Sequence, residues 1–468
     1  MGEASATAGV AVELAASQGD VDEVALAKIL EENPHCKQLS ASLARPFLNA
    51  SLLPRALHDE DRFMSPSWPK MVYTKRPDAE RSSCHWGQLK LFESELKCLT
   101  DFGLAASTEG ARHASPAPSG EQGNATGEQG TLGEQDLTAT TDKQLVGRAN
   151  GDLDKMPVIL YVGAAPGRHV PALAKRFPTC RFELYDPANF DQRLRDFAES
   201  DEAGGRVTIV QDFFDDSRAQ QICARRHSAP LVFVCDIRTA DPLQMGGGEV
   251  EEFIERDMAR QRAWVEALRP DVSLLKFRLP WGPGRTQYLS GRVLVQAFPP
   301  CTSTETRLLV SRKDIDVADT TYDHEIYEQQ LMYHNTIKRA QLHDVGVPSS
   351  GVGAVVGLDK CFDCAAVAAT VRSYLAARNG TTPDRVLDHH VGQEISAIIA
   401  EISESGRTLA TPYHVSSSRH GGRHFAKRRY VDAAGQDHFT VEAAAGGAET
   451  QPRKRRRGRK ATGAQDTA

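Results

Sequence analysis

Long apolar runs and a regular cysteine pattern are both missing from this sequence of 468 residues. Because no run reaches the roughly eighteen apolar residues that a span needs, no membrane helix is expected. The first residues, MGEASATAGVAVELAAS, lack the basic start of a secretory signal peptide. Nine cysteines, an odd number without a framework, favour reduced thiols in an intracellular compartment over a set of disulfides.

An overall excess of basic residues is also absent, since the formal net charge is −6. Composition alone therefore does not indicate a nucleic-acid partner. Basic charge is instead concentrated near the C-terminus, in QPRKRRRGRK at 451–460. Residues 453–460 fit a solvated tail, a nuclear import signal or an arm that binds phosphates, and we favour RNA contact together with nuclear import.

The common phosphate-binding loops are missing from the clearest strand, turn and helix of the sequence. The apolar run 158–162 enters the turn Gly163-Ala-Ala-Pro-Gly167, after which Leu173 and Phe177 recur at helical spacing. The turn has neither the G-x-G-x-x-G spacing of dinucleotide enzymes nor the Gly-Lys-Ser/Thr of a P-loop. A glycine turn before a helix N-terminus still predicts a site for an anionic or nucleotide-like ligand.

Composition divides the chain into an arm, a domain and a tail. Residues 1–62 are polar and alanine-rich and predict a poorly ordered N-terminal arm, whereas 63–400 carry the periodic apolar residues of a folded domain. Within the domain, residues 105–155 repeat Gly-Glu-Gln amid Ser, Thr and Ala and predict a low-complexity surface insertion. Residues 401–468 are polar and basic and predict a disordered tail.

Strand-like and helix-like segments alternate between residues 156 and 312. A long helix is expected at 249–268, and strands are expected at 158–162, 181–186, 207–214, 231–238, 272–280, 291–298 and 305–312. Strands joined by helical crossovers predict a Rossmann-like α/β fold, with a mostly parallel sheet covered by helices on both faces. The last two strands have short connections, which predicts an antiparallel edge.

The residues at the carboxyl ends of these strands suggest which ligand binds there. Asp186 ends the second strand, where a carboxylate can accept both hydroxyls of a ribose, and Phe214 follows the third as an apolar wall for a base. An adenosine site without a pyrophosphate loop fits S-adenosylmethionine. Taken alone, Gly163 and Gly167 could equally form a plain tight turn, with Asp186 a surface acid.

Four charged residues favour a ligand site over a plain tight turn. Lys276 lies within the apolar strand SLLKFRL and needs a partner or a cleft, since a buried unpaired ammonium is costly. Asp236 ends the neighbouring strand, Glu305 opens another, and Lys90 lies on an amphipathic helix at 84–102. Two lysines and two acids at one end of a sheet could handle the proton of a ribose hydroxyl. Individually, Lys90 could be a solvated helix residue and Glu305 an ordinary ion-pair partner.

The motifs WGQLKLFESEL, LYVGAAPGRH, LVFVCDIRT, LLKFRLPW, VQAFPPCTSTETRLLV and YEQQLMYHN occur in this order. With the order Lys-Asp-Lys-Glu, the chain resembles RNA ribose 2′-O-methyltransferases of the FtsJ/RrmJ type. It more closely resembles the poxvirus-type cap-specific mRNA 2′-O-methyltransferases, which also serve as the small stimulatory subunit of poly(A) polymerase. The resemblance covers roughly residues 70–340.

This resemblance assigns roles to individual residues. It implies that Lys90, Asp236, Lys276 and Glu305 form a catalytic tetrad. In this tetrad, Lys276 deprotonates or aligns the target hydroxyl, Lys90 and Asp236 tune Lys276, and Glu305 holds it in place. It places cofactor contacts at Gln88, Tyr161, Gly163, Gly167, Asp186, Phe214 and Asp236. The arginine that the family has after the ribose acid is absent, because DPA stands at 186–188.

For the cap, the resemblance implies two aromatic rings around 7-methylguanine and acids at the edge of the base. Trp281 matches the second aromatic position, Tyr73 the first and Glu328 one acid. Pro283 stands where a second acid is expected, which predicts weaker cap selectivity. The base is cationic after methylation and therefore stacks strongly on an electron-rich ring.

Together, these observations predict methylation of the ribose 2′-hydroxyl of the first transcribed nucleotide of m7G-capped mRNA, with S-adenosyl-L-methionine as cofactor and no metal. The expected partners are capped mRNA and the catalytic subunit of a poly(A) polymerase, without a membrane. The expected location is intracellular, in the nucleus or in a virus factory or virion. Two alternatives stay open, a non-catalytic RNA-binding subunit that stimulates the polymerase and a 2′-O-methyltransferase for internal rRNA or tRNA sites. The pair Cys361 and Cys364 fits core cysteines better than a zinc site.

Overall fold

The computed structural model describes residues 54–73, 89–105, 150–225, 229–240, 245–300, 303–403, 408–409, 426–431 and 437–442. Contacts divide the chain into two units, residues 1–419 and 420–468. The predicted insertion falls almost entirely outside the described residues, and its last six residues form a short 3₁₀ helix, η5 (Asn150–Lys155). Among the described helices, none is both long and apolar enough to cross a membrane.

A seven-stranded sheet forms the centre of the first unit, in the order β4-β3-β2-β5-β6-β9-β8. The strands are β2 (Val158–Val162), β3 (Arg181–Tyr185), β4 (Val207–Val210), β5 (Leu231–Cys235), β6 (Val272–Phe277), β8 (Arg292–Leu294) and β9 (Thr306–Ser311). The first five are parallel, and β9 pairs antiparallel with both β6 and β8. This confirms the predicted Rossmann-like fold with its antiparallel edge.

Continuous apolar sequence explains why β2 and β5 lie at the centre. All five residues of each strand are buried, as expected for strands that helices cover on both faces. The strands end earlier than the sequence predicted, β4 at Val210 instead of residue 214 and β5 at Cys235 instead of 238. Asp236, the residue directly after β5, therefore lies at the carboxyl edge of the sheet, with 18% of its side chain exposed.

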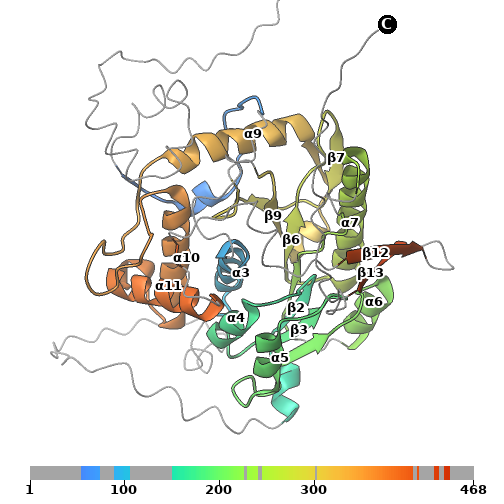
Figure 1. The fold of residues 1–468 in the computed structure, drawn as a ribbon, viewed down its shortest axis with the longest axis horizontal. Coiled ribbons are helices and arrows are strands. Elements are labelled where there is room, and N and C mark those ends of the chain that lie inside the picture. Colours follow the sequence, from blue (N-terminus) through green and yellow to red (C-terminus); the bar gives the residue numbers. More distant parts are fainter. Residues whose placement is uncertain are drawn as a thin grey trace, which may run out of the picture. The chain divides into compact units, whose positions relative to one another are not determined.

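Helices cover the two faces of the sheet in two groups (Figure 1). On one face, α3 (Leu89–Asp101) contacts α4 (Val170–Arg176) and α10 (Phe362–Arg378), and α11 (Asp388–Ile402) contacts α4 and α10. A second group consists of α6 (Asp216–Arg225) and α7 (Gly247–Leu268), which contact each other. The crossover α5 (Gln192–Glu199) lies beside α4.

The described N-terminal segment packs on the domain before the boundary predicted at residue 63. Its strand β1 (Arg55–Ala56) pairs with β11 (His343–Asp344), and η2 (Asp59–Arg62) follows it. Arg62 is buried and donates to Glu93 of α3 over 2.6 Å. The boundary at residue 63 was predicted from hydropathy. Hydropathy does not indicate that residues 54–62 pack on the domain, because this segment is held partly by buried ion pairs.

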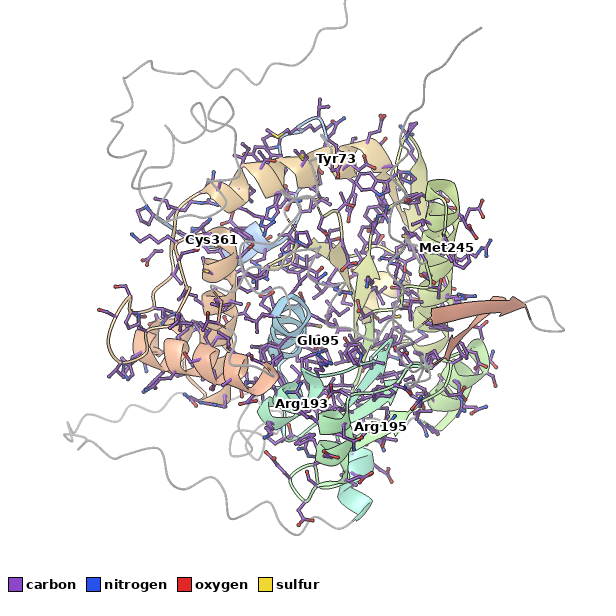
Figure 2. All side chains as sticks on the ribbon, in the orientation of Figure 1. Tyr73, Glu95, Arg193, Arg195, Met245 and Cys361 are labelled. Carbon is purple, nitrogen blue, oxygen red and sulfur yellow. The ribbon has the colours of Figure 1, made fainter. Side chains whose placement is uncertain are left out.

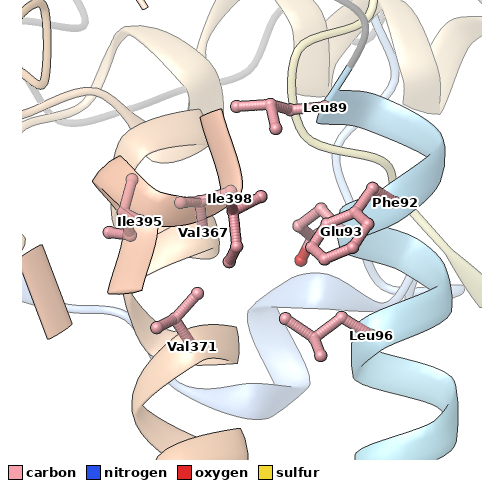
Figure 3. Close-up of a pocket in the computed structure, with 8 residues that line it drawn as sticks. All are labelled: Leu89, Phe92, Glu93, Leu96, Val367, Val371, Ile395 and Ile398. Carbon is pink, nitrogen blue, oxygen red and sulfur yellow. The ribbon is translucent and has the colours of Figure 1, made fainter. Parts of the chain in front are cut away.

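Apolar side chains of α3, α10 and α11 enclose a small cavity (Figure 3). Its lining is Leu89, Phe92, Glu93, Leu96, Val367, Val371, Ile395 and Ile398. Glu93 is the polar member, and Thr370 and Arg62 donate to its Oε1. We interpret this cavity as a packing defect of the helical layer, because it is lined almost wholly by the apolar core.

The remaining elements flank the sheet or lie in the second unit. A ribbon of β7 (Arg285–Tyr288) and β10 (Thr320–Asp323) was not predicted from the sequence, and it leads through β10 into α9 (His324–Thr336). Short turns of helix are α8 (Arg312–Ile315), η6 (Lys338–Ala340) and η7 (Pro383–Arg385). In the second unit, β12 (Ala426–Val431) and β13 (Asp437–Glu442) form an antiparallel hairpin. The rest of the predicted tail after Leu409 lies outside the described residues.

Candidate active site

The glycine turn lies where the chain order of the sheet reverses. From β2 the chain runs outward through β3 and β4, then returns to β5 on the other side of β2. In open α/β sheets, ligands bind at such a switch point, beyond the carboxyl ends of the strands. Gly163 directly follows β2 and Asp236 directly follows β5, so the two segments meet there.

Close backbone contact explains the first glycine of the turn. Gly163 has φ +82°, and a Cβ atom there would lie 2.8 Å from the carbonyl carbon of Asp236 and from the amide nitrogen of Ile237. Any other residue would therefore strain its own backbone and push the end of β5 away. The requirement for glycine comes from the neighbouring strand.

An open pocket of about 380 Å³ lies over this turn. Its lining is Lys90, Leu91, Tyr161, Gly163, Ala164, Ala165, Pro166, Gly167, Arg168, His169, Asp236, Phe298 and Pro300. The volume falls within the range of small-molecule and cofactor sites. The lining joins the turn to α3 and to the loop after β8, three segments far apart in the sequence.

The structure separates the cofactor positions predicted from the sequence into four groups. Tyr161, Gly163, Gly167 and Asp236 line the pocket. Asp186 lies behind the turn, where its Oδ2 accepts the Ala165 N–H over 3.1 Å and its Oδ1 accepts the Ala188 N–H over 2.8 Å. Gln88 lies outside the described residues.

Phe214 forms the fourth group, because it packs in the core. It is 7% exposed and makes edge contacts with Tyr185 and Trp264, with ring centroids 5.1 and 5.0 Å away. Its place directly after a strand suggested a wall for a base. The early end of β4 at Val210 instead leaves this ring under α7, which carries Trp264.

The four charged residues singled out in the sequence converge beside the pocket. Lys90 Nζ lies 2.8 Å from Glu305 Oε1. Lys276 Nζ lies 3.2 Å from Asp236 Oδ1 and 3.5 Å from Glu305 Oε2. Between 13% and 23% of each of these four side chains is exposed, so the group is sheltered but accessible. The predicted Lys-Asp-Lys-Glu group therefore exists as one connected cluster.

A fifth charge completes the cluster. Arg307 lies directly opposite Lys276 in the β6–β9 pairing, so both side chains leave the sheet on the same face. Arg307 is 2% exposed, and its Nη1 donates to Asp236 Oδ1 over 2.6 Å, while Nη2 lies 3.8 Å from Glu305 Oε1. Three cations thus surround two carboxylates, which gives the cluster a net positive charge.

These cations set the protonation state of the two acids. Burial alone would raise the pKa of Glu305, but Lys276, Lys90 and Arg307 together hold it well below its ordinary value. Burial likewise opposes ionisation of Asp236, and Arg307 and Lys276 outweigh it and lower the pKa. Both acids are therefore carboxylates at neutral pH, able to accept hydrogen bonds and to fix the two lysines.

A buried pair joins the turn to the helix that carries Lys90. His169, at the start of α4, lies with its Nε2 2.9 Å from an oxygen of Glu95, which is on α3 (Figure 2). Burial would lower the pKa of His169, but Glu95 raises it above the ordinary value. Burial and the charges of Glu95 and Asp236 raise the pKa of Tyr161 well above its ordinary value, so this residue stays a phenol.

Three arginines near the site, Arg238, Arg278 and Arg307, differ in their hydrogen-bond partners. Arg278 donates to Glu251 of α7 over 2.8 Å, and Arg307 pairs within the charge cluster. Both terminal nitrogens of Arg238 are buried and have no hydrogen-bond partner among the described residues. Among Arg238, Arg278 and Arg307, Arg238 is thus the one without an acidic partner in the described part of the chain.

The residues assigned to the cap also lie together. The rings of Tyr73 and Trp281 have centroids 4.8 Å apart and are inclined at 60°. Tyr73 lies beside α9 (Figure 2), since Met71 donates its N–H to Gln329 over 3.1 Å. Glu328 of α9 accepts the Gly282 N–H over 3.4 Å, and burial raises the pKa of its carboxyl.

The Cys361–Cys364 pair lies in the core at the start of α10. Cys361 is the N-cap residue, and its sulfur accepts the Cys364 N–H. The ligand atoms of Asp359 and the two cysteines lie within 4.8 Å of one another. Burial raises the pKa of Cys364 to about 11, which favours a thiol in the packed core, as the sequence suggested.

Sequence reasoning missed several residues of the site. Arg307 was not among the predicted site residues, although its place two residues after Glu305 put both side chains on one face of the strand. His169 and Glu95 gave no signal, because they are far apart in the chain. Phe298 and Pro300 line the pocket only because the loop after β8 returns to it.

The sheet order, the switch-point pocket and the charge cluster define a Rossmann-like α/β protein with a ligand site at the carboxyl end of its strands. Comparison with known proteins then confirms the family resemblance. Residues 144–345 match the model of the family described as poly A polymerase regulatory subunit.

Two curated relatives carry the name cap-specific mRNA (nucleoside-2′-O-)-methyltransferase. The one from Fowlpox virus (strain NVSL) is 29% identical over 199 residues, or 40% of this chain and 60% of that protein. The one from Myxoma virus (strain Lausanne) is 25% identical over 195 residues, or 39% of this chain and 54% of that protein. The chain therefore matches little more than half the length of these relatives.

Solved structures give weaker similarity. An O-methyltransferase family protein from Burkholderia thailandensis is 12% identical, with a TM-score of 0.17 over 27% of this chain and 34% of that one. An antibiotic-related methyltransferase is 13% identical, with a TM-score of 0.18 over 30% of this chain and 62% of that one. The fold class stated above rests on the strand order and pairing, not on these two similarities.

Proposed function

We propose that this chain transfers a methyl group from S-adenosylmethionine to the 2′-hydroxyl of the first transcribed nucleotide of m7G-capped mRNA. The observation that carries the proposal is the position of Lys276. Its ammonium lies between Asp236 and Glu305, and Asp236 also lines the pocket over the glycine turn. The relatives named as cap 2′-O-methyltransferases support the same assignment.

The pocket suits the cofactor in size and in kind. Gly163 keeps the turn flush against the end of β5, which leaves backbone rather than side chains facing the ligand. Phe298 and Leu91 supply apolar surface, and Asp236 and Lys90 line the side toward the charge cluster. When bound there, S-adenosylmethionine would supply a methyl group already activated by its sulfonium.

The chain's own residues would position the ribose and manage one proton. Lys276 forms ion pairs with Asp236 and Glu305, and its ammonium carries three N–H donors, one of which could donate to the hydroxyl oxygen. Asp236 and Glu305 fix the ammonium. Lys276 and Arg307 lower the pKa of both acids, and Lys90 adds to this effect at Glu305. The positive cluster lowers the energy of the oxygen as negative charge develops on it. The hydroxyl proton passes directly to solvent, or to a Lys276 amine that has first given up one of its own protons to solvent.

The cap would be held by the ring pair. Tyr73 and Trp281 already touch, and stacked rings around a third ring need centroids about 7 Å apart, so the two must separate for a base to enter. Trp281 is 38% exposed, and the strand that carries Lys276 ends four residues before it. A base stacked on Trp281 would therefore lie close to the ribose at Lys276.

Methyl transfer to RNAs that differ only at the 5′ end tests the proposal. We expect transfer to m7G-capped RNA, weak transfer to GpppN-RNA, and almost none to the uncapped form. Trp281→Ala should raise KM for capped RNA about thirtyfold, because a desolvated cation–π stack contributes about 2 kcal/mol to binding. The affinity for S-adenosylmethionine should stay unchanged. Equal transfer to capped and uncapped RNA would favour an internal rRNA or tRNA site instead.

The match to the regulatory-subunit family supports a second role, stimulation of a poly(A) polymerase. This role requires RNA binding and a contact with the polymerase, and it does not require methyl transfer. A Lys276→Ala protein that still lengthens the tails made by a poly(A) polymerase would show that the two roles are separable. If the wild-type protein has no effect on tail length, the stimulatory role is refuted and only the methyltransferase proposal is left.

A further inference from the structure

A second acid lies at the ring pair, although Pro283 stands where the sequence was expected to provide one. It is Glu251, which comes from α7, about thirty residues before Trp281 in the chain. Its Oε2 accepts the Trp281 N–H over 3.0 Å, and its Oε1 accepts from Arg278 Nη2 over 2.8 Å. The Glu251 side chain is 20% exposed, so solvent screens these contacts only partly.

Arg278 creates an electrostatic problem for cap binding at this place. Its guanidinium carbon lies 5.2 Å from the ring centroid of Trp281, within the range of a cation–π contact. A 7-methylguanine stacked on the same ring would bring a second positive charge close to the first. Without a compensating acid, Arg278 would repel the methylated base and would favour the neutral unmethylated one.

Glu251 supplies that compensation. One carboxylate neutralises Arg278, and Glu328, which accepts the Gly282 N–H, adds a second. The two acids and one arginine leave the surroundings of Trp281 with a net negative charge when all are ionised. Such surroundings attract a cationic purine more strongly than a neutral purine of the same shape.

We propose that Glu251 is a specificity-determining residue of the cap site, which makes Trp281 selective for cationic 7-methylguanine by neutralising Arg278. This inference rests on the proposed cap methyltransferase function and extends it. On this proposal, an acid from a different element takes the place of the acid that is missing at Pro283.

Binding of the cap analogues m7GpppG and GpppG to the full chain tests the inference. Glu251→Gln keeps an oxygen that can accept the Trp281 N–H and removes only the charge. We expect the ratio of the two affinities to fall about fivefold, because a cation–π contact weakens when a neighbouring cation competes for the ring. S-adenosylhomocysteine affinity should not change and serves as the check on folding.

Two further variants separate a local effect from a general one. Glu252→Gln removes the same charge from the next residue, whose side chain is 66% exposed and contacts Arg256, and it should leave the ratio unchanged. Adding Arg278→Gln to Glu251→Gln removes the cation that was left unpaired and should restore the preference for m7GpppG. A merely structural role of Glu251 would not be rescued in this way.

The outcomes distinguish the inference from the function on which it rests. A wild-type chain that binds both analogues equally would refute cap recognition itself. A wild type that prefers m7GpppG, with an unchanged preference in Glu251→Gln or no recovery in the double variant, would overturn the role of Glu251 alone.

Discussion

Lys276 is the residue on which the proposed chemistry depends, because its ammonium bridges both carboxylates of the charge cluster. Lys276→Ala should lower kcat for methyl transfer by about 100-fold or more, as loss of a positioned proton-transfer group does. The affinity for S-adenosylmethionine, measured by calorimetry, should stay the same. Lys175→Ala, at an exposed lysine of α4 that pairs with Glu202, is the control. Activity of Lys276→Ala within about tenfold of wild type would refute the assignment.

Arg307 shows how much a buried charge can matter to stability. It is almost fully buried and holds Asp236 and Glu305 as carboxylates, so Arg307→Met would leave two acids without their main buried partner. We expect the free energy of unfolding to fall by about 3–5 kcal/mol in urea titrations. Arg312→Met breaks an exposed pair with Asp271 and should cost less than about 1 kcal/mol. Equal losses in the two variants would contradict this account.

At the scale of elements, the pairing of β1 with β11 should make stability depend on pH through His343. Its ring is fully buried, and burial with the nearby Arg55 lowers its pKa to about 4. In the unfolded chain it takes up a proton near its ordinary pKa of about 6.5. The unfolded state therefore binds more protons between these values, and stability falls as the pH is lowered from about 6.5 to 4.

The size of this effect follows from the same shift. The loss should approach about 3 kcal/mol by pH 4, on top of changes from other groups. Denaturant unfolding of wild type and His343→Gln across this range would isolate the contribution, because the variant lacks the titrating ring. If both proteins lose stability with the same slope, His343 does not carry the dependence.

At the scale of the whole molecule, the Gly-Glu-Gln segment should be dispensable for the proposed chemistry. It follows α3 and precedes η5 in the chain, and its many Gly, Glu, Gln, Ser and Thr residues offer little apolar surface to a core. Replacing residues 110–148 by a Gly-Ser linker of about ten residues should leave Tm and methyl transfer nearly unchanged. A shortened protein that no longer binds S-adenosylmethionine would show that the segment is structural.

The sequence by itself determined the features that depend on local pattern. Continuous apolar runs predict buried strands such as β2 and β5, and the crossover helices between strands predict a parallel sheet. The glycine turn after β2 and the charged residues at strand ends were readable because parallel strands bring their carboxyl ends to one edge. Lys90, Asp236, Lys276 and Glu305 were therefore predicted to meet, and they do.

Only the tertiary structure decided which side chains pair across elements. Arg307 became part of the charge cluster through its register with Lys276, and Phe214 became a core residue because β4 ends early and α7 covers it. Glu251 contacts Trp281 from α7, and no local sequence motif could indicate this contact. Ion pairs and backbone contacts of this kind depend on distances between elements, and those distances are fixed by packing rather than by spacing along the chain.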